Sequence, residues 1–118
     1  MKRYGKGFTL LELLLVILIL GVLSTIAVSV LFKMRERAAV ASIESDLSIA
    51  YKAAIDHYTD NPGTEVTLPL LHEHGYNPSP DVSIQVLNGF EETLMLEASH
   101  PLVSGLFQMD STGVLISP

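Results

Sequence analysis

Residues 7–32 read GFTLLELLLVILILGVLSTIAVSVLF, and this stretch decides the fold. Its last twenty residues, 13–32, carry no charge, and most of them are Leu, Ile or Val. As an α-helix, twenty residues rise about 30 Å, which matches the hydrocarbon core of a bilayer. A helix of a small soluble domain is rarely apolar on every face. The sequence therefore predicts that residues 8–32 form a membrane-spanning helix.

The charges of the chain are distributed unevenly around this helix. The formal net charge is -6, with Lys2, Arg3 and Lys6 ahead of the apolar run and the acidic excess beyond it. An acidic C-terminal region is a poor match for nucleic acid. The chain has no cysteine, which excludes a disulfide and a thiolate metal site.

Residues 1–7, MKRYGKG, are predicted to be a basic leader peptide rather than part of the folded domain. A simple secretory signal is the alternative. Such a signal has a shorter apolar core that ends at a small-x-small cleavage site. Here the apolar run is longer and no clean site of that kind ends it.

The helix is expected to continue past the membrane segment as an amphipathic helix over residues 33–60. This region contains neither Pro nor Gly, and Asn61, Pro62 and Gly63 then end it. Its apolar residues recur at helical spacing and form one stripe: Val40, Ile43, Leu47, Ala50, Ala54 and Tyr58. The stripe predicts a partner surface on one side of the helix.

Residues 61–118 are expected to supply that surface. An irregular connector over 64–81, with a short helical turn near 68–74, precedes four β-like runs at about 82–87, 93–98, 104–109 and 113–117. Asn88-Gly89 and the segment 110–113 are turn signals. The predicted fold class is α+β, with a long N-terminal helix packed on a small C-terminal antiparallel sheet.

Glu12 is not explained by a membrane-spanning helix alone. It is a single carboxylate at the edge of a membrane-length run, where a charge is costly and normally has a partner or a function. No basic residue lies within helical reach on the apolar side.

The basic leader, Gly7, the sequence Phe-Thr-Leu-Leu-Glu-Leu and the apolar helix together resemble the class III signal of type IV pilins and type II secretion pseudopilins. The resemblance in motif covers about residues 2–32. Beyond it only the architecture is similar. Two departures are plain, because residues 8–61 lack the proline that many relatives carry and no cysteine pair closes a C-terminal loop.

The resemblance implies a processing site and an assembly site. Gly7 would be the last leader residue, cut from Phe8 by prepilin peptidase, and the new amine of Phe8 would be methylated. Glu12 would neutralise the Phe8 amine of a neighbouring subunit. The implied partners are copies of this chain, other pilins, prepilin peptidase, an inner-membrane assembly platform and, before assembly, the lipid bilayer.

The resemblance also implies a location and a role. The precursor would cross the bacterial inner membrane once, with its N-terminus cytoplasmic and its head periplasmic, and would then enter a periplasmic or surface filament. A type IV pilus subunit and a secretion pseudopilin both fit, as major or minor components. A signal-anchored binding protein that never polymerises and a membrane-anchored enzyme or metal-binding domain are the alternatives from other classes.

No catalytic or metal site, and no cofactor, is predicted. His72-Glu73-His74 is interpreted as a solvated connector, because His at i and i+2 do not share a helix face. Asp56, His57 and Asp60 are given ordinary surface roles, and Asp110-Ser111-Thr112 is interpreted as a turn rather than a calcium loop. Ser99-His100 is not a triad, and Tyr51 and Tyr58 are expected to be core contacts.

Overall fold

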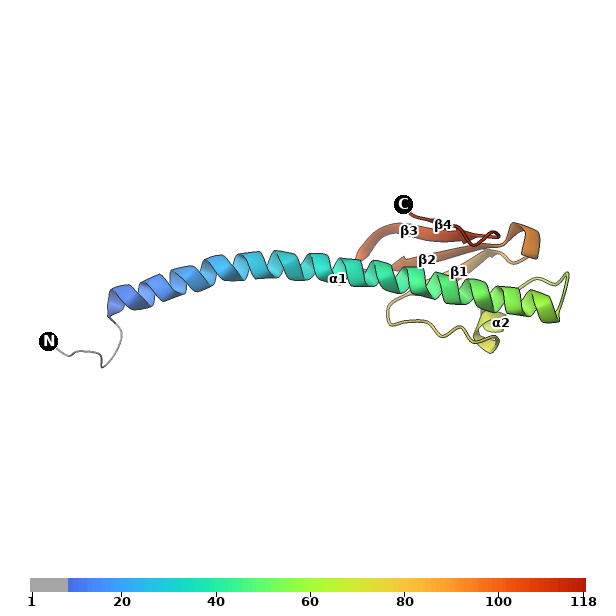
Figure 1. The fold of residues 1–118 in the computed structure, drawn as a ribbon, viewed down its shortest axis with the longest axis horizontal. Helices are drawn as coiled ribbons and strands as arrows, with labels where there is room; N and C mark the ends of the chain where they lie inside the picture. Colours follow the sequence, from blue (N-terminus) through green and yellow to red (C-terminus); the bar gives the residue numbers. More distant parts are fainter. Residues whose placement is uncertain (1–8) are drawn as a thin grey trace. The chain divides into compact units, whose positions relative to one another are not determined.

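The computed structural model describes residues 9–118. The predicted leader 1–7 and Phe8 therefore lie outside the described residues. Figure 1 shows the order of the elements: α1 (Leu10–Asp60), α2 (Leu68–Glu73), β1 (Ser83–Asn88), a 3-10 turn at Glu91–Thr93, β2 (Met95–His100), β3 (Val103–Asp110) and β4 (Leu115–Ile116). The α+β prediction, with one long N-terminal helix and a small antiparallel sheet, is confirmed.

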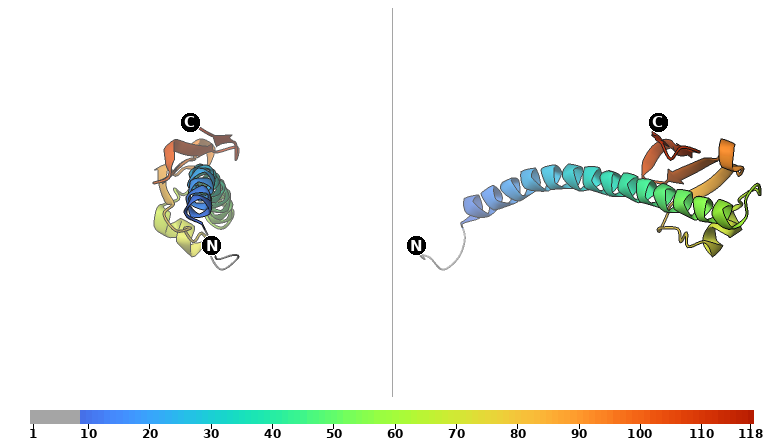
Figure 2. Two further views of the ribbon diagram at one scale, coloured as in Figure 1. Left: turned by 90° about the vertical axis from the view of Figure 1, so that its left-hand side faces the viewer. Right: turned by 45° about the vertical axis from the view of Figure 1, so that its right-hand side comes forward.

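The chain divides into two compact units at residue 35, and each is described by itself. The first unit is described from Thr9 to Arg35 and consists of the apolar part of α1. The second unit, Glu36–Pro118, contains the rest of α1, α2 and the sheet. We call this second unit the head. In Figures 1 and 2 its sheet lies along one side of the C-terminal part of α1, and α2 lies beside a neighbouring side.

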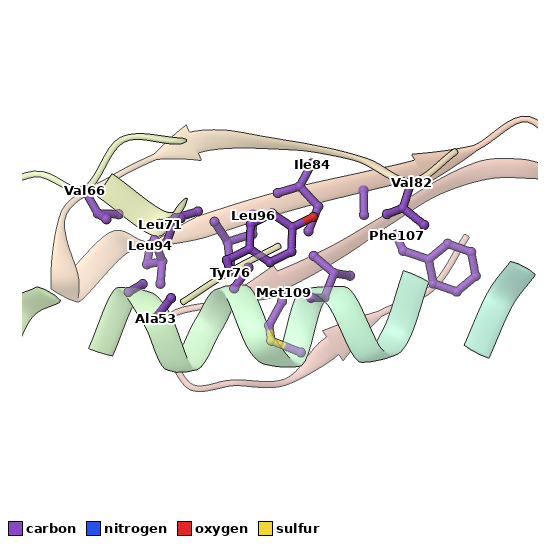
Figure 3. Close-up of a cluster of buried hydrophobic side chains, with 14 of the residues drawn as sticks. Ala53, Val66, Leu71, Tyr76, Val82, Ile84, Leu94, Leu96, Phe107 and Met109 are labelled. Carbon is purple, nitrogen blue, oxygen red and sulfur yellow. The ribbon is translucent and has the colours of Figure 1, made fainter. Parts of the chain in front are cut away.

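The head is built on the predicted apolar stripe of α1. Ile43, Leu47, Ala50 and Ala54 are all 0% exposed. The helix side is rich in alanine, which lets the sheet approach closely. Figure 3 shows the residues that fill the space between them, and the cluster includes Val66, Leu71, Tyr76, Val82, Ile84, Leu94, Leu96, Ala98, Phe107 and Met109.

The sheet has the strand order β1-β2-β3-β4, with every neighbouring pair antiparallel. Ile84, Ala98 and Phe107 lie opposite one another across three strands, and all three are buried. Their sequence neighbours point to the other face, as the two-residue period of a strand requires. The four predicted strands are thus confirmed with shifted ends, and the last is shorter than expected.

The turn predicted at Asn88-Gly89 is present where β1 ends, but the connection to β2 is longer than a two-residue hairpin and includes the 3-10 turn. Gly89 is also a docking point for the connector. Its carbonyl accepts the Val66 N–H at 2.8 Å and also the hydroxyl of Tyr58. A Cβ at this position would overlap the Val66 carbonyl, which explains why glycine stands there.

Tyr58 is a core residue, as expected, and its hydroxyl is held in the donor state. Burial raises the pKa of Tyr58 to about 12, and repulsion from Glu91 and Glu65 adds to the effect. Tyr51 is half-buried and donates its hydroxyl to the Ser111 carbonyl at 3.2 Å. Both tyrosines therefore join α1 to loops of the head.

Asp46 is a buried carboxylate that the sequence pattern did not reveal. It is 1% exposed and accepts hydrogen bonds from the Ser79 N–H at 2.8 Å, the Ser79 hydroxyl at 2.6 Å and the Tyr76 hydroxyl at 3.3 Å. Buried charges are tolerated when hydrogen bonds satisfy them. Asp46 therefore fastens the connector between α2 and β1 to the helix.

Candidate processing and assembly site

The first turn of α1 is closed by a reciprocal pair of hydrogen bonds between Thr9 and Glu12. The Glu12 N–H donates to the Thr9 hydroxyl at 3.1 Å, and the Thr9 N–H donates to Glu12 Oε2 at 3.3 Å. This is a capping box, in which Ser or Thr and a Glu three residues later satisfy two free amide groups at a helix start. A carboxylate there also interacts favourably with the positive end of the helix dipole.

Glu12 thus has a local partner, Thr9, that was not predicted. The signal was present, since Thr9-Leu10-Leu11-Glu12 has the spacing of a capping box ahead of an apolar run. Glu12 was interpreted in terms of a basic partner alone, so this local signal was not used. Only one carboxylate oxygen of Glu12 is used by the cap among the described residues, so Oε1 is open to a second donor.

The apolar part of α1 is exposed along its whole described length. Every residue from Thr9 to Ala38 is exposed, including Leu20 at 57% and Phe32 at 61%. Among residues 9–118, α1 alone is long and apolar enough to cross a membrane.

The hydroxyl groups within this segment form their hydrogen bonds inside the helix itself. Ser24, Thr25 and Ser29 donate to carbonyls three or four residues earlier in the same helix, at 2.6, 2.7 and 3.0 Å. Such back-bonding satisfies polar groups inside an apolar medium. The surface that remains is suited to lipid or to other apolar helices.

The predicted site residues are described only in part. Gly7 and Phe8 lie outside residues 9–118, so the structure does not describe the predicted cleavage site. Glu12 lies in the first turn of α1, four residues after Phe8 in sequence, and its side chain is exposed.

Three side chains that were assigned no functional role, Asp110, His72 and His57, have the following contacts. Asp110 holds a turn, as expected, because Oδ1 accepts from the N–H groups of Thr112 and Val114 and from the Thr112 hydroxyl. His72 contacts the Tyr76 carbonyl at 2.9 Å. His57 was wrongly placed at the surface, since it is only 4% exposed and its ring packs against Tyr58.

Comparison with known proteins identifies the N-terminal segment. Residues 2–28 match the family model for the prokaryotic N-terminal methylation motif. Three curated relatives named type II secretion system core protein G are similar to the chain. The protein from Klebsiella pneumoniae is 44% identical over 70 residues, which is 56% of this chain and 49% of the relative.

The other two relatives give the same picture. The protein from Dickeya chrysanthemi is 41% identical over 75 residues, covering 60% of this chain and 48% of the relative. The protein from Aeromonas hydrophila is 42% identical over 74 residues, covering 59% of this chain and 51% of the relative. The chain therefore spans about half the length of the curated relatives it matches. The N-terminal segment of this chain thus carries the prokaryotic N-terminal methylation motif, and over 70–75 residues the chain is similar to type II secretion system core protein G.

Proposed function

We propose that the chain is a non-enzymatic structural subunit of a pilus-like filament, of the type II secretion pseudopilin kind. It is made as an inner-membrane precursor, cut between Gly7 and Phe8, and polymerised through α1. The observation that carries the proposal is the exposed apolar surface of α1 from Leu10 to Phe32, most of which lies within the methylation motif at residues 2–28. A surface of this kind needs lipid or other helices around it.

The same surface can serve the membrane and the filament. In the bilayer, residues 13–32 contact acyl chains, and in the filament they contact the equivalent helices of neighbouring subunits. Because both surroundings are apolar, transfer between them changes the burial of this surface little. Close packing between helices then decides which state is favoured.

Glu12 is proposed to set the register between subunits. Its free oxygen accepts the Phe8 amine of a neighbour while Oε2 continues to cap its own helix. Two unit charges about 4 Å apart attract by roughly 4 kcal/mol at an effective dielectric constant of 20. Desolvation of both groups offsets much of this, so the pair fixes position more than it adds stability.

The pseudopilin role is favoured over that of a type IV pilus subunit because all three relatives named above carry a type II secretion name. The proposed topology has the N-terminus in the cytoplasm and the head in the periplasm. This orientation rests on the motif, since Lys33, Arg35 and Arg37 balance the positive charges of the leader. An anchored binding protein that does not polymerise is the second candidate.

Processing is tested with Gly7→Leu, co-expressed with prepilin peptidase. We expect the variant to keep the precursor size, whereas the wild type shortens to 111 residues, that is, 118 minus 7. Gly5→Leu, in the same leader, is the matched control and is expected to be cut normally. Normal shortening of the Gly7 variant would contradict the proposed cleavage site.

Assembly is tested with Glu12→Ala, with Glu36→Ala as the control. Both carboxylates are exposed on α1, but only Glu12 lies in its first turn. We expect the Glu12 variant to be cleaved but to form few or no filaments in electron micrographs. The Glu36 variant is expected both to be cleaved and to form filaments. Normal filaments from the Glu12 variant would overturn the register role.

A further inference from the structure

Three metal-ligating side chains that are separated in sequence meet at the end of α1. Asp56 and Asp60 lie one turn apart near its C-terminus, and His74 follows α2. One ligand atom from each of the three lies within 4.8 Å of the other two. His74 Nδ1 is 2.7 Å from Asp56 Oδ2. In the sequence these residues belong to two separate segments, 56–60 and 72–74.

The two carboxylates are in an unfavourable electrostatic position. Like charges at i and i+4 on a helix repel, and both lie at the negative end of the helix dipole. Among residues 9–118, no Lys or Arg is within ion-pair distance of Asp56 or Asp60, and the imidazole of His74 is charged only when protonated. A bound cation would relieve this repulsion.

A second observation, on His57, points to a ligand in the same place. The His57 side chain is buried and lies beside the cluster, with its ring centroid 5.4 Å from that of His74. Its Nε2 contacts the Thr64 hydroxyl at 2.9 Å, but its Nδ1 is buried and has no hydrogen-bond partner among the described residues. A buried nitrogen without a partner is costly, and in native proteins a bound water or ion commonly accounts for one.

We propose that Asp56, Asp60 and His74 bind a divalent transition-metal ion of the zinc type, with a metal-bound water that donates to Nδ1 of His57. An imidazole nitrogen with two carboxylate oxygens suits Zn²⁺ better than Ca²⁺ or Mg²⁺, which prefer oxygen alone. Ligand atoms of a tetrahedral zinc lie about 3.4 Å apart. A pair at the 4.8 Å limit therefore needs to close by about 1.4 Å, whereas His74 Nδ1 and Asp56 Oδ2, at 2.7 Å, need to separate by about 0.7 Å. The ion would fasten the end of α1 to the segment that follows α2.

The probe is Zn²⁺ itself, added to the full chain, without a histidine tag, in detergent micelles. Calorimetry measures stoichiometry and affinity, and ¹⁵N chemical shifts of the imidazole rings report which nitrogen binds. We expect one Zn²⁺ per chain, a large shift at Nδ1 of His74, and little change at His72 and His100. Asp56→Asn, Asp60→Asn and His74→Gln are each expected to weaken binding by about tenfold or more.

Matched controls are Glu73→Gln and His72→Gln, which alter exposed neighbours of His74 outside the cluster. Both are expected to bind Zn²⁺ as the wild type does, and circular dichroism checks that every variant is folded. Equal losses in controls and cluster variants would overturn the proposal, as would a wild-type chain that shows no shift at His74. Displacement of Zn²⁺ by an equal concentration of Ca²⁺ would also overturn it, because an unselective acidic surface would then explain the binding.

Discussion

The two parts of α1 use the same helical backbone for opposite purposes. Between Leu10 and Arg35 the helix carries most of its large apolar side chains, and all of those are exposed. In the head, the helix carries small alanines and a few large residues, and its stripe is buried under the sheet. Leu20 is 57% exposed, whereas Leu47 is 0% exposed. The more apolar part therefore leaves its surface exposed, as the proposed assembly through α1 requires, and the less apolar part contributes to folding of the head.

The largest test of this contrast compares Leu47→Ala with Leu20→Ala. Removing a buried leucine leaves a cavity and costs about 3–5 kcal/mol, so the Leu47 variant is expected to lose most of the stability of the head. The Leu20 variant is expected to leave the head unchanged, since Leu20 is exposed and belongs to the other compact unit. Urea unfolding in detergent, followed by the near-ultraviolet circular dichroism of the tyrosines, measures both. Equal destabilisation by the two changes would contradict the division of roles.

Asp46 provides a smaller test within the head. In Asp46→Ala, the Ser79 N–H and the Tyr76 hydroxyl lose their buried acceptor, which is expected to lower the free energy of unfolding by about 1–3 kcal/mol. Glu44→Ala, an exposed carboxylate two residues earlier, is the control and is expected to change it by less than about 0.5 kcal/mol. A neutral effect of Asp46→Ala on the same unfolding curve would mean that the connector is held by its apolar contacts alone.

Much of this architecture could be predicted from periodicity. The stripe that includes Ile43 and Leu47 predicted which side of α1 is covered, and the alternation in residues 82–86 predicted a half-buried strand. Periodicity failed where a single polar contact decides the structure. From sequence alone Asp46 is indistinguishable from a surface charge, because its partners come from residues 76–79. Gly89 is recognisable only as a turn residue, because its contact with the connector at Val66 is distant in sequence.

The prediction of the candidate site also failed to include one polar contact. The motif located Glu12 and predicted its importance, but a carboxylate at a helix start has two possible partners, one local and one on a neighbour. The hydrogen bonds with Thr9 supply the local one. The cluster of Asp56 with His74 depends on how the connector returns to the helix, which no local pattern encodes.

Thr9 tests the cap in the apolar part. Thr9→Ala removes the hydroxyl that accepts the Glu12 N–H, and loss of an N-cap costs about 0.5–2 kcal/mol. We expect the amide of Glu12 to exchange with deuterium about 2- to 30-fold faster in micelles, as that range of free energy implies. Thr25→Ala, which removes only a back-bonded hydroxyl, is the control. Equal acceleration in both variants would exclude a specific cap.

The smallest effect is expected at the turn after β3. Hydrogen bonds from the Thr112 hydroxyl, and then from the Val114 N–H, hold the pKa of Asp110 below its ordinary value of 3.8. Because the folded pKa is depressed, the carboxylate contributes to stability above that value and loses its contribution as the pH falls below it. The difference in unfolding midpoint between wild type and Asp110→Asn is therefore expected to be small at pH 6 and to shrink below pH 3.8. A difference that does not change with pH would show that the charge is irrelevant there.

The central claim is that the apolar surface of α1 exchanges lipid for neighbouring helices on assembly. Because the chain has no cysteine, a nitroxide attached through Ile17→Cys reports on this surface alone, and Ser48→Cys on the exposed side of the head is the control. Electron paramagnetic resonance measures how readily oxygen and a water-soluble nickel complex reach each label. We predict that oxygen but not nickel reaches position 17 in the membrane, and that neither reaches it in the filament. Nickel access at position 17 in the filament, or unchanged oxygen access, would contradict the account.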